Sequence, residues 1–282
     1  MMPADEAIIL AGGFGTRLRG IVDDVPKPLA PVAGRPFLVW VLDRLASSGM
    51  RRCILATGYM SETIEQSIGM RWQGMDIAYS VESEPLGTGG AIALAATRLH
   101  GDAAHVLNGD TWLEYQPAAL EAAARAVDAP MAIALARVDD VARYGAVDVA
   151  DGRVAAFREK GEAGPGWINA GCYFLGADAL VALPSRDVFS FEQEVLQPRV
   201  HAGGVAAFTR TCDFIDIGVP EDYARAQLQF AGRSSLPRQS ARRSLTLPRM
   251  PSLPLLQPRV ARCSWIAMVS STSITDTCIQ PP

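Results

Sequence analysis

The 282-residue chain is poor in the residues that build disulfides and zinc sites. Its five cysteines are scattered, odd in number and without a Cys-x-x-Cys pair. We therefore expect neither a disulfide framework nor a zinc site, but small apolar side chains in a reducing compartment. The histidines have no evident partner in the sequence and are expected to be structural or exposed: His100, His105 and His201.

An excess of charge and long apolar runs are also absent. The formal net charge is -4, which provides no basic face for a nucleic acid or an anionic membrane surface. The apolar run at residues 7–11 is too short for a signal-peptide core or a membrane span, and no basic segment precedes it. We expect a cytoplasmic protein without nucleic-acid or membrane partners, and the oligomeric state stays open.

Strand-like and helix-like segments alternate in the first half of the chain. With 49% hydrophobic residues, the chain can bury a substantial core. Ser61 is the expected N-cap of the second helix. The alternation predicts an α/β fold, with a Rossmann-like, mostly parallel central sheet flanked by helices. Short apolar runs predict strands, and apolar residues at helical spacing predict helices: strands 7–10, 52–57, 77–81, 105–107 and 132–137; helices 36–48, 61–68, 90–98 and 117–126.

The second half is richer in strand signals. Asp151-Gly152 between two apolar segments is a strong hairpin signal, and a smaller β-rich part is expected. From residue 233 onward Ser, Pro and Arg dominate without periodicity, which predicts a disordered tail at 233–282 after a domain at 1–232. The expected elements of the β-rich part are strands 145–149, 154–158, 168–174 and 205–209 and helices 191–197 and 222–230.

A glycine loop follows the first predicted strand, Leu10-Ala11-Gly12-Gly13-Phe14-Gly15-Thr16-Arg17-Leu18. Glycines allow the backbone to approach a polyphosphate and to point N–H groups at it, and Arg17 adds a charge for phosphate oxygens. The loop lacks the Gly-Lys-Ser/Thr of a Walker motif. Alone, it also fits an ordinary strand-to-helix turn.

Two further motifs carry charged side chains. Pro26-Lys27-Pro28 fixes the backbone on both sides of a lysine, which suits a phosphate at a defined position. Asn108-Gly109-Asp110 follows a predicted strand, and a carboxylate there suits a partial Mg²⁺ ligand set that phosphates and water complete. A capping role is the alternative for a single Asp in a turn.

The glycine loop and Pro-Lys-Pro together resemble the signature of the sugar-1-phosphate nucleotidylyltransferases, over roughly residues 7–229. This resemblance implies substrates, a nucleoside triphosphate and a sugar 1-phosphate, and Mg²⁺ as cofactor. It implies that Arg17, Lys27 and Asp110 are catalytic and that Asp110 and Asp216 bind the metal. Asp213, Glu221 and Asp222 surround Asp216, so a helix-capping role for Asp216 stays an alternative.

The resemblance also assigns binding residues. Gly87 and Gly89 would permit close contact with base and ribose, and Gly90 would open the next helix. The implied nucleotide-binding residues are Leu10, Ala11, Gly12, Gly13, Gly15, Thr16, Glu84, Pro85, Gly87, Thr88 and Gly89. The implied sugar-phosphate-binding residues are Tyr144, Gly145, Glu159, Lys160 and Asn169.

Segments 82–90 and 216–223 resemble most the D-glycero-α-D-manno-heptose 1-phosphate guanylyltransferases. This implies transfer of GMP from GTP to the heptose 1-phosphate, with a product for cell-surface polysaccharides such as lipopolysaccharide, capsule or S-layer glycan. Mannose-1-phosphate guanylyltransferases and N-acetylmuramate-1-phosphate uridylyltransferases share much of the pattern. A non-catalytic nucleotide-sugar sensor is the alternative from another class, but such relatives usually lose the loop Arg, the Lys or a metal Asp.

The tail carries a second resemblance in a shifted reading frame. Trp and Met have single codons, so the frame that begins at the third base of each codon forces Asp at Trp265-Ile266. The same frame forces Gly at Met268-Val269, and the codons between allow Arg and Asp. Asp-Arg-Asp-Gly resembles the nucleophile motif of haloacid-dehalogenase-type phosphatases, especially the heptose bisphosphate phosphatases. The tail is therefore hypothesised to be an out-of-frame remnant of a fused phosphatase.

The gene sequence tests this hypothesis directly. We expect the nucleotides beneath Trp265–Ile279 to encode Asp-Arg-Asp-Gly in the adjacent frame, and the tail as translated to have no phosphatase activity. Any other codons at these positions exclude the fused phosphatase.

Overall fold

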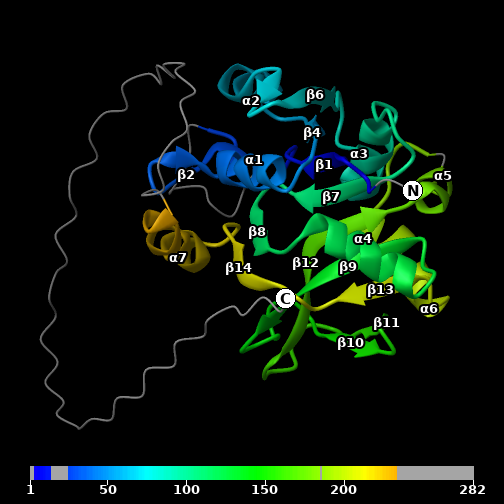
Figure 1. Cartoon of the computed structure of the whole chain (residues 1–282). Coiled ribbons are helices and arrows are strands. Elements are labelled where there is room, and N and C mark those ends of the chain that lie inside the picture. Colours follow the sequence, from blue (N-terminus) through cyan, green and yellow to red (C-terminus); the bar gives the residue numbers. More distant parts are fainter. Residues whose placement is uncertain (1–2, 14–24, 185, 234–282) are drawn as a thin grey trace, which may run out of the picture. The chain divides into compact units, whose positions relative to one another are not determined.

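The first half of the chain alternates between strands and helices, as predicted (Figure 1). The structure, a computed structural model, describes residues 3–13, 25–184 and 186–233. The elements of this half are β1 (Glu6–Leu10), the 3₁₀ turn η2 (Lys27–Leu29), β2 (Pro31–Val32), β3 (Arg35–Pro36), α1 (Phe37–Ser47), β4 (Arg52–Thr57), α2 (Ser61–Ile68), β5 (Arg71–Trp72), β6 (Met75–Val81), α3 (Gly87–Ala96), β7 (Ala104–Asn108), β8 (Thr111–Glu114), α4 (Pro117–Ala126) and β9 (Met131–Val138).

The second half contains the predicted hairpin. Asp151 and Gly152 have φ angles of 50° and 73°, the left-handed conformations that a two-residue type I′ turn requires. The prediction of a hairpin at this dipeptide is confirmed. The elements of this half are β10 (Val147–Ala150), β11 (Arg153–Phe157), β12 (Gly166–Leu175), α5 (Ala177–Val181), the π-helical turn η3 (Glu192–Leu196), α6 (Gln197–His201), β13 (Val205–Phe208), β14 (Cys212–Asp216) and α7 (Pro220–Ala231).

Ten strands form one sheet in the order β10-β11-β13-β9-β12-β7-β1-β4-β6-β5. Strands β7, β1, β4 and β6 form its parallel block, which confirms the predicted Rossmann-like sheet, and the β-rich half extends the same sheet through β12. From β1 the chain proceeds to β4 and β6 on one side and then crosses to β7 on the other. This reversal opens a crevice at the carboxyl ends of β1 and β7, where sheets of this type bind ligands.

Helices cover both faces of the sheet, because successive side chains of a strand point to opposite faces. On β1, Ile9 packs in the cluster under α1, α4 and α7, whereas Ile8 packs in the cluster under α3, α5 and α6. Both isoleucines are fully buried, and burial of such a side chain stabilises a fold by about 1.5–3 kcal/mol. The two cores hold β1, and therefore the start of the glycine loop, from both sides.

A two-stranded ribbon of β8 and β14 stands apart from the large sheet. Helix α7 packs against it through Phe230, whose ring lies 5.0 Å from that of Trp112 and 5.1 Å from that of Trp40. Gln227 of α7 also donates a hydrogen bond to the carbonyl of Pro31 (2.7 Å). Helix α7, the last described element, therefore connects the β8–β14 ribbon to the segment around Pro31.

Three local expectations differ from the structure. Met60, with a left-handed φ of 56°, occupies the N-cap of α2, and Ser61 is its first helical residue. Helix α3 begins at Gly87 rather than at Gly90. Arg233, assigned to the tail, packs on the folded part, because its guanidinium lies 4.9 Å from the Trp112 ring and pairs with Glu114 (3.1 Å).

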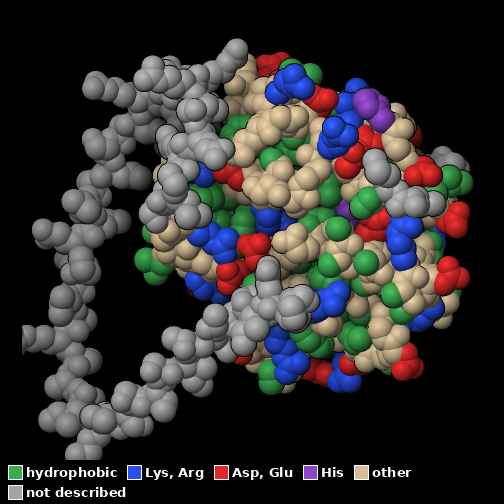
Figure 2. Space-filling view, in the orientation of Figure 1, with side chains coloured by type: hydrophobic (Ala, Val, Ile, Leu, Met, Phe, Trp, Pro, Cys, Tyr) green, Lys and Arg blue, Asp and Glu red, His purple; other side chains and the backbone are tan. Residues whose placement is uncertain are grey.

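The charge distribution on the surface and the character of the helices are relevant to nucleic-acid and membrane partners. Acidic and basic side chains are interspersed over the face shown in Figure 2. Among the described residues, no helix combines the length and the apolar character that crossing a bilayer requires.

Gly90 provides a test of the packing of α3. A methyl group at Gly90 would collide with the carbonyl oxygen of Asp187 and lie 2.8 Å from Leu86 Cβ. We expect Gly90→Ala to lower the free energy of unfolding by about 1–3 kcal/mol, because overpacking outweighs the better helix propensity of alanine. Urea denaturation measures this. Gly232→Ala, where an added methyl meets nothing, is the matched control and should be close to neutral.

Candidate active site

A cleft of about 350 Å³ opens at the carboxyl ends of β1 and β7. Nine of the predicted site residues line it, from the glycine loop, the Pro-Lys-Pro turn, the segment after β6 and the turn after β7. They are Leu10, Ala11, Gly12, Gly13, Lys27, Pro85, Gly87, Thr88 and Asp110. The predicted residues Gly15, Thr16 and Arg17 lie outside the described residues.

Small residues let the strand ends of the cleft approach each other. The amide of Gly109 donates to the carbonyl oxygen of Leu10 (2.8 Å), and a methyl group on Gly109 would lie 2.6 Å from that oxygen. On the other side, the amide of Ala11 donates to the carbonyl of Ala56 (2.7 Å). The glycine loop therefore leaves β1 between the ends of β7 and β4.

Lys27 lies where two carboxylates meet. Its turn is held by Pro26, whose carbonyl accepts from the amide of Leu29 (2.7 Å). The ammonium pairs with the carboxylate of Asp110. A methyl group on Gly218 would lie 2.7 Å from Lys27 Nζ and 2.6 Å from Asp216 Oδ1. The ammonium and both predicted metal carboxylates thus face one small region.

The ribbon explains how residues far apart in sequence meet. Asp216 is the register partner of Thr111 in the antiparallel β8–β14 pair. The amide of Ile217 donates to the carbonyl oxygen of Asp110 (3.0 Å), and the amide of Gly218 donates to Asp216 Oδ1 (2.7 Å). Burial and the charge of Asp110 raise the pKa of Asp216 above its ordinary value, although Gly218, Lys27 and Arg143 act in the opposite sense. The two carboxylates are therefore electrostatically coupled.

Glu82 lines the cleft but is not among the predicted site residues, although it lies in segment 82–90, which carries part of the family resemblance. Its Oε2 accepts from the amide of Leu86 (3.2 Å). Burial raises the pKa of Glu82, which the bond from Leu86 partly offsets. Its other carboxylate oxygen has no hydrogen-bond partner among the described residues, and it would lie 3.7 Å from a methyl group on Gly12. The predicted Glu84, by contrast, is exposed and does not line the cleft.

The glycines after Leu86 have a packing role that the sequence analysis missed. The amide of Gly89 donates to the carbonyl of Phe189 (3.0 Å), and a side chain on Gly89 would collide with the Phe189 ring. At Gly87 an added methyl would lie 2.6 Å from the Phe189 carbonyl. These glycines admit segment 187–189 rather than serving only contact with a ligand. Gly87 still lines the cleft, and Gly89 does not.

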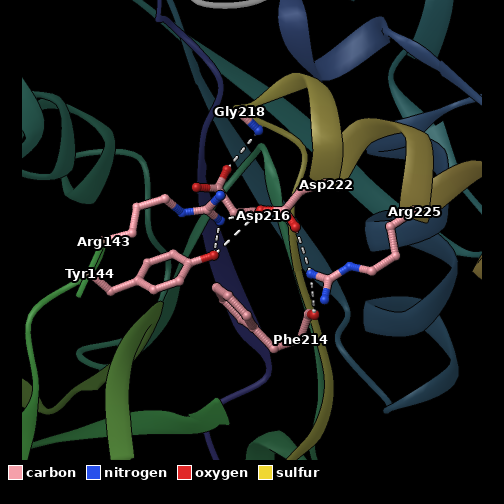
Figure 3. Close-up of polar contacts among 7 residues, drawn as sticks. All are labelled: Arg143, Tyr144, Phe214, Asp216, Gly218, Asp222 and Arg225. Carbon is pink, nitrogen blue, oxygen red and sulfur yellow. Dashed lines mark hydrogen bonds and ion pairs between the residues drawn. The ribbon is translucent and has the colours of Figure 1, made fainter. Parts of the chain in front are cut away.

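Four of the five predicted sugar-phosphate residues lie close together, and one of them lines a second pocket of about 440 Å³. Tyr144 lines it and packs edge-to-face on Phe214 of β14, with ring centroids 5.6 Å apart (Figure 3). Gly145 has a φ of 84°, and a methyl group there would lie 2.7 Å from the carbonyl of Arg158. The exposed Glu159 and Lys160 follow directly.

Asn169 lies apart from these residues, in a bulge of β12. Its Nδ2 donates to the hydroxyl of Tyr173 (2.9 Å), and its Oδ1 accepts from the amide of Gly171 (2.8 Å). Gly171 has a φ of 66°, and a side chain there would collide with that of Asn108. Because Asn108 lines the first cleft, the bulge places Asn169 near its rim.

A family model described as nucleotidyl transferase matches residues 6–232. The chain belongs to the nucleotidyl transferase family. It is 40% identical over 222 residues to a D-glycero-α-D-manno-heptose 1-phosphate guanylyltransferase of Aneurinibacillus thermoaerophilus, covering 79% of this chain and 96% of that protein. It is 38% identical over 226 residues to a mannose-1-phosphate guanylyltransferase of Mycobacterium tuberculosis, covering 78% and 63%.

A solved member of the family has the same fold. The crystal structure of HddC from Yersinia pseudotuberculosis, complexed with GMP-PN, matches with a TM-score of 0.70 and 38% sequence identity. The match covers 80% of this chain and 99% of that chain. The family resemblance and the fold class are thereby confirmed, whereas the roles of the individual site residues stay predictions.

Among the described residues, no histidine or cysteine lines the cleft. His105 is fully buried on β7, where desolvation and the nearby Arg44 lower its pKa to about 3. Cys53 and Cys172 are also buried, and burial raises the pKa of Cys172 to about 11. These neutral groups fill the core, whereas His100 and His201 are exposed.

Thr88 offers a test of the packing role of segment 87–90. Its hydroxyl donates to Glu192 Oε2 (2.7 Å) and accepts from the amide of Phe191 (3.0 Å), one of the first amides of the helical segment η3–α6. We expect Thr88→Val to lower the free energy of unfolding by about 1–2 kcal/mol, because both hydrogen bonds are lost. Chemical denaturation without ligand measures this. Thr88→Ser keeps the hydroxyl, and an equal loss in both variants contradicts the interpretation.

Proposed function

We propose that this protein transfers GMP from GTP to D-glycero-α-D-manno-heptose 1-phosphate and releases pyrophosphate. The observation that carries the proposal is the cleft that joins the glycine loop, Lys27 and Asp110 to the carboxylate of Glu82. The heptose enzyme of A. thermoaerophilus, 40% identical over 96% of its length, supports the choice of substrate.

Glu82 supports guanine as the base. A carboxylate offers only acceptors, and its two oxygens can take a pair of parallel N–H donors. Guanine presents such a pair on its Watson–Crick edge, N1–H beside the exocyclic N2–H. Uracil and thymine present a carbonyl oxygen on each side of their single N–H. The carboxylate repels these oxygens. A carboxylate at this position therefore favours GTP over UTP and dTTP.

The two carboxylates fit a hard divalent cation such as Mg²⁺. Asp110 and Asp216 supply oxygen ligands that face the region where the Lys27 ammonium now lies. No group of three His, Cys, Asp or Glu gathers within the described ranges, so phosphate oxygens and water would complete the coordination. When bound, the metal would neutralise charge on the triphosphate.

The reaction forms one bond and breaks another at the α-phosphorus. A phosphate oxygen of the sugar 1-phosphate attacks the α-phosphorus of GTP, and the bond to the β-phosphate oxygen breaks as pyrophosphate leaves. Two anions must approach each other, so alignment and charge neutralisation dominate the barrier. The N–H groups of the glycine loop hold the triphosphate, and Lys27 and Arg17 carry the compensating charge. No covalent nucleophile of the protein takes part.

Two substrate alternatives have their own support. Mannose 1-phosphate is favoured by the 38% identity to the M. tuberculosis enzyme. N-acetylmuramate 1-phosphate with UTP rests on the shared motif alone, and Glu82 argues against it. A non-catalytic sensor is less well supported, because Lys27, Asp110 and Asp216 are all present and converge.

The wider assignments belong to the same proposal. Residues 1–232 would form the catalytic domain, with Arg233 packed on it, and the product would enter the synthesis of a cell-surface polysaccharide such as lipopolysaccharide, capsule or S-layer glycan. Because the proposed substrates are a nucleoside triphosphate and a sugar 1-phosphate, we expect the reaction to take place in the cytoplasm. The remainder of the tail would be the frameshifted remnant described above.

A substrate matrix tests the function. Pyrophosphate release is measured with GTP, UTP, CTP and dTTP against heptose, mannose and N-acetylmuramate 1-phosphates. We expect the highest kcat/KM for GTP with the heptose 1-phosphate, loss of turnover in EDTA and recovery on addition of Mg²⁺. Turnover of mannose 1-phosphate alone excludes the heptose assignment, and GTP binding without any pyrophosphate release favours the sensor.

Glu82→Gln tests the recognition of guanine. The amide of glutamine replaces one acceptor oxygen by a donor, so it clashes with one of the two guanine N–H groups. We expect kcat/KM for GTP to fall about tenfold to a hundredfold, the equivalent of about 1–3 kcal/mol. The preference for GTP over UTP should fall with it. Glu62→Gln, at an exposed position of α2 outside the cleft, is the matched control. An unchanged preference in Glu82→Gln contradicts the assignment.

A further inference from the structure

The second pocket contains a charged network that the family motifs do not include. Arg143 pairs with the carboxylate of Asp222, and the same carboxylate pairs with Arg225 (2.8 Å) (Figure 3). The hydroxyl of Tyr144 lies within reach of both, 3.4 Å from Asp222 Oδ2 and in contact with Arg143. Two guanidinium groups therefore share one carboxylate, which leaves one positive charge in the network.

Arg143 is held on one side and open on the other. Among the described residues, its hydrogen bonds all come from Nη2, which donates to the Tyr144 hydroxyl and to Asp222 Oδ2. A guanidinium has five N–H donors, and those on Nε and Nη1 have no acceptor among the described residues. The side chain of Asp222 is 11% exposed, whereas that of Arg143 is 43% exposed. The buried carboxylate thus orients a guanidinium that a ligand can still reach.

The guanidinium of Arg143 lies close to one of the carboxylates of the predicted reaction centre. Phe214 and Asp216 are two positions apart on β14 and therefore point to the same side of the strand. Tyr144 packs on Phe214, and Figure 3 shows the guanidinium of Arg143 beside the carboxylate of Asp216. The network consequently lies between the second pocket and the carboxylates that converge on Lys27.

The backbone of the Arg143 loop is fixed at both ends. The amide of Arg158 donates to the carbonyl of Ala146 (2.8 Å), and the amide of Gly161 donates to the carbonyl of Ala142 (3.0 Å). The close contact at Gly145 lies between these two bonds. The loop of Arg143 and the turn with Lys160 therefore form one rim, with a cation on each.

We propose that Arg143 binds the phosphate group of the sugar 1-phosphate and that Asp222 and Tyr144 position its guanidinium. This inference rests on the proposed function and names a binding residue that the family motifs do not assign. The planar fork of an arginine matches two phosphate oxygens. The phosphate would lie between Arg143 and the carboxylate pair, on the path to the α-phosphorus. Arg225 offsets the charge of Asp222, so the charge of Arg143 remains available to the ligand.

Steady-state kinetics and calorimetry test the proposal. We expect Arg143→Ala to raise KM for the sugar 1-phosphate at least tenfold while KM for GTP changes less than twofold. Arg143→Lys, which keeps the charge but loses the fork, should recover only part of this loss. Calorimetric titration of the sugar 1-phosphate, with a non-hydrolysable GTP analogue bound, should show the same order of affinities without depending on turnover.

Arg137 provides the matched control for charge. It lines the same pocket, but its guanidinium lies over the Trp167 ring (5.5 Å), and the described ion pairs of Asp222 are with Arg143 and Arg225. Arg137→Ala should change KM for the sugar 1-phosphate less than threefold. Equal effects of Arg137→Ala and Arg143→Ala would mean that the pocket responds only to net charge, and this would overturn the assignment.

Asp222→Asn tests the positioning role. Loss of the carboxylate should raise KM for the sugar 1-phosphate about threefold to tenfold and leave KM for GTP unchanged, whereas a purely structural defect would change both. The non-phosphorylated sugar serves as a competitive inhibitor, and its inhibition constant should be insensitive to Arg143→Ala. Wild-type protein that binds the sugar phosphate without turnover would refute the proposed function alone. Unchanged affinity in Arg143→Ala, or no binding by the wild type, would refute the role of Arg143.

Discussion

The attraction of one ammonium for two carboxylates organises the centre of this protein. Asp110 lies in the turn between β7 and β8, whereas Asp216 ends β14. Their negative charges repel each other, and burial together with the charge of Asp110 raises the pKa of Asp216. Like charges that are partly shielded from water repel each other more strongly than they would in bulk solvent. The backbone pairing of β8 with β14 overcomes this repulsion, and Lys27 offsets it. The same arrangement suits a site that must receive a cation and then a triphosphate.

The glycines of the cleft solve two different packing problems. Gly12 and Gly109 let the ends of β1, β4 and β7 approach each other, so the opening of the cleft is formed by backbone. Gly87, Gly89 and Gly90 instead admit segment 187–189 against α3. The first group shapes the place for a polyphosphate. The second group holds α3, which borders the cleft, against segment 187–189. A substitution in that segment should therefore change the position of α3.

The β-rich half contributes the second pocket, in which basic and acidic side chains form ion pairs with one another. Arg143 and Arg225 share the buried Asp222, and Tyr144 fixes the geometry through Phe214. Such a network costs less than an isolated buried charge, because each ionised group has a partner. It also leaves an exposed guanidinium in a fixed orientation beside Asp216. A nucleotidyl transferase needs this kind of order, since two anionic substrates must meet in one alignment.

The sequence by itself determined the α/β alternation, the hairpin at Asp151-Gly152 and the motifs that line the cleft, because these depend on local periodicity and on residues with special backbone conformations. It also contained Glu82 and Arg143 beside recognised motifs, but nothing local marked them as cleft or pocket residues. Only the tertiary structure decided that β8 pairs with β14, that α3 begins at Gly87 and that Arg233 packs on the folded part. These outcomes depend on contacts between segments about 100 residues apart, and a local pattern carries no information about such partners.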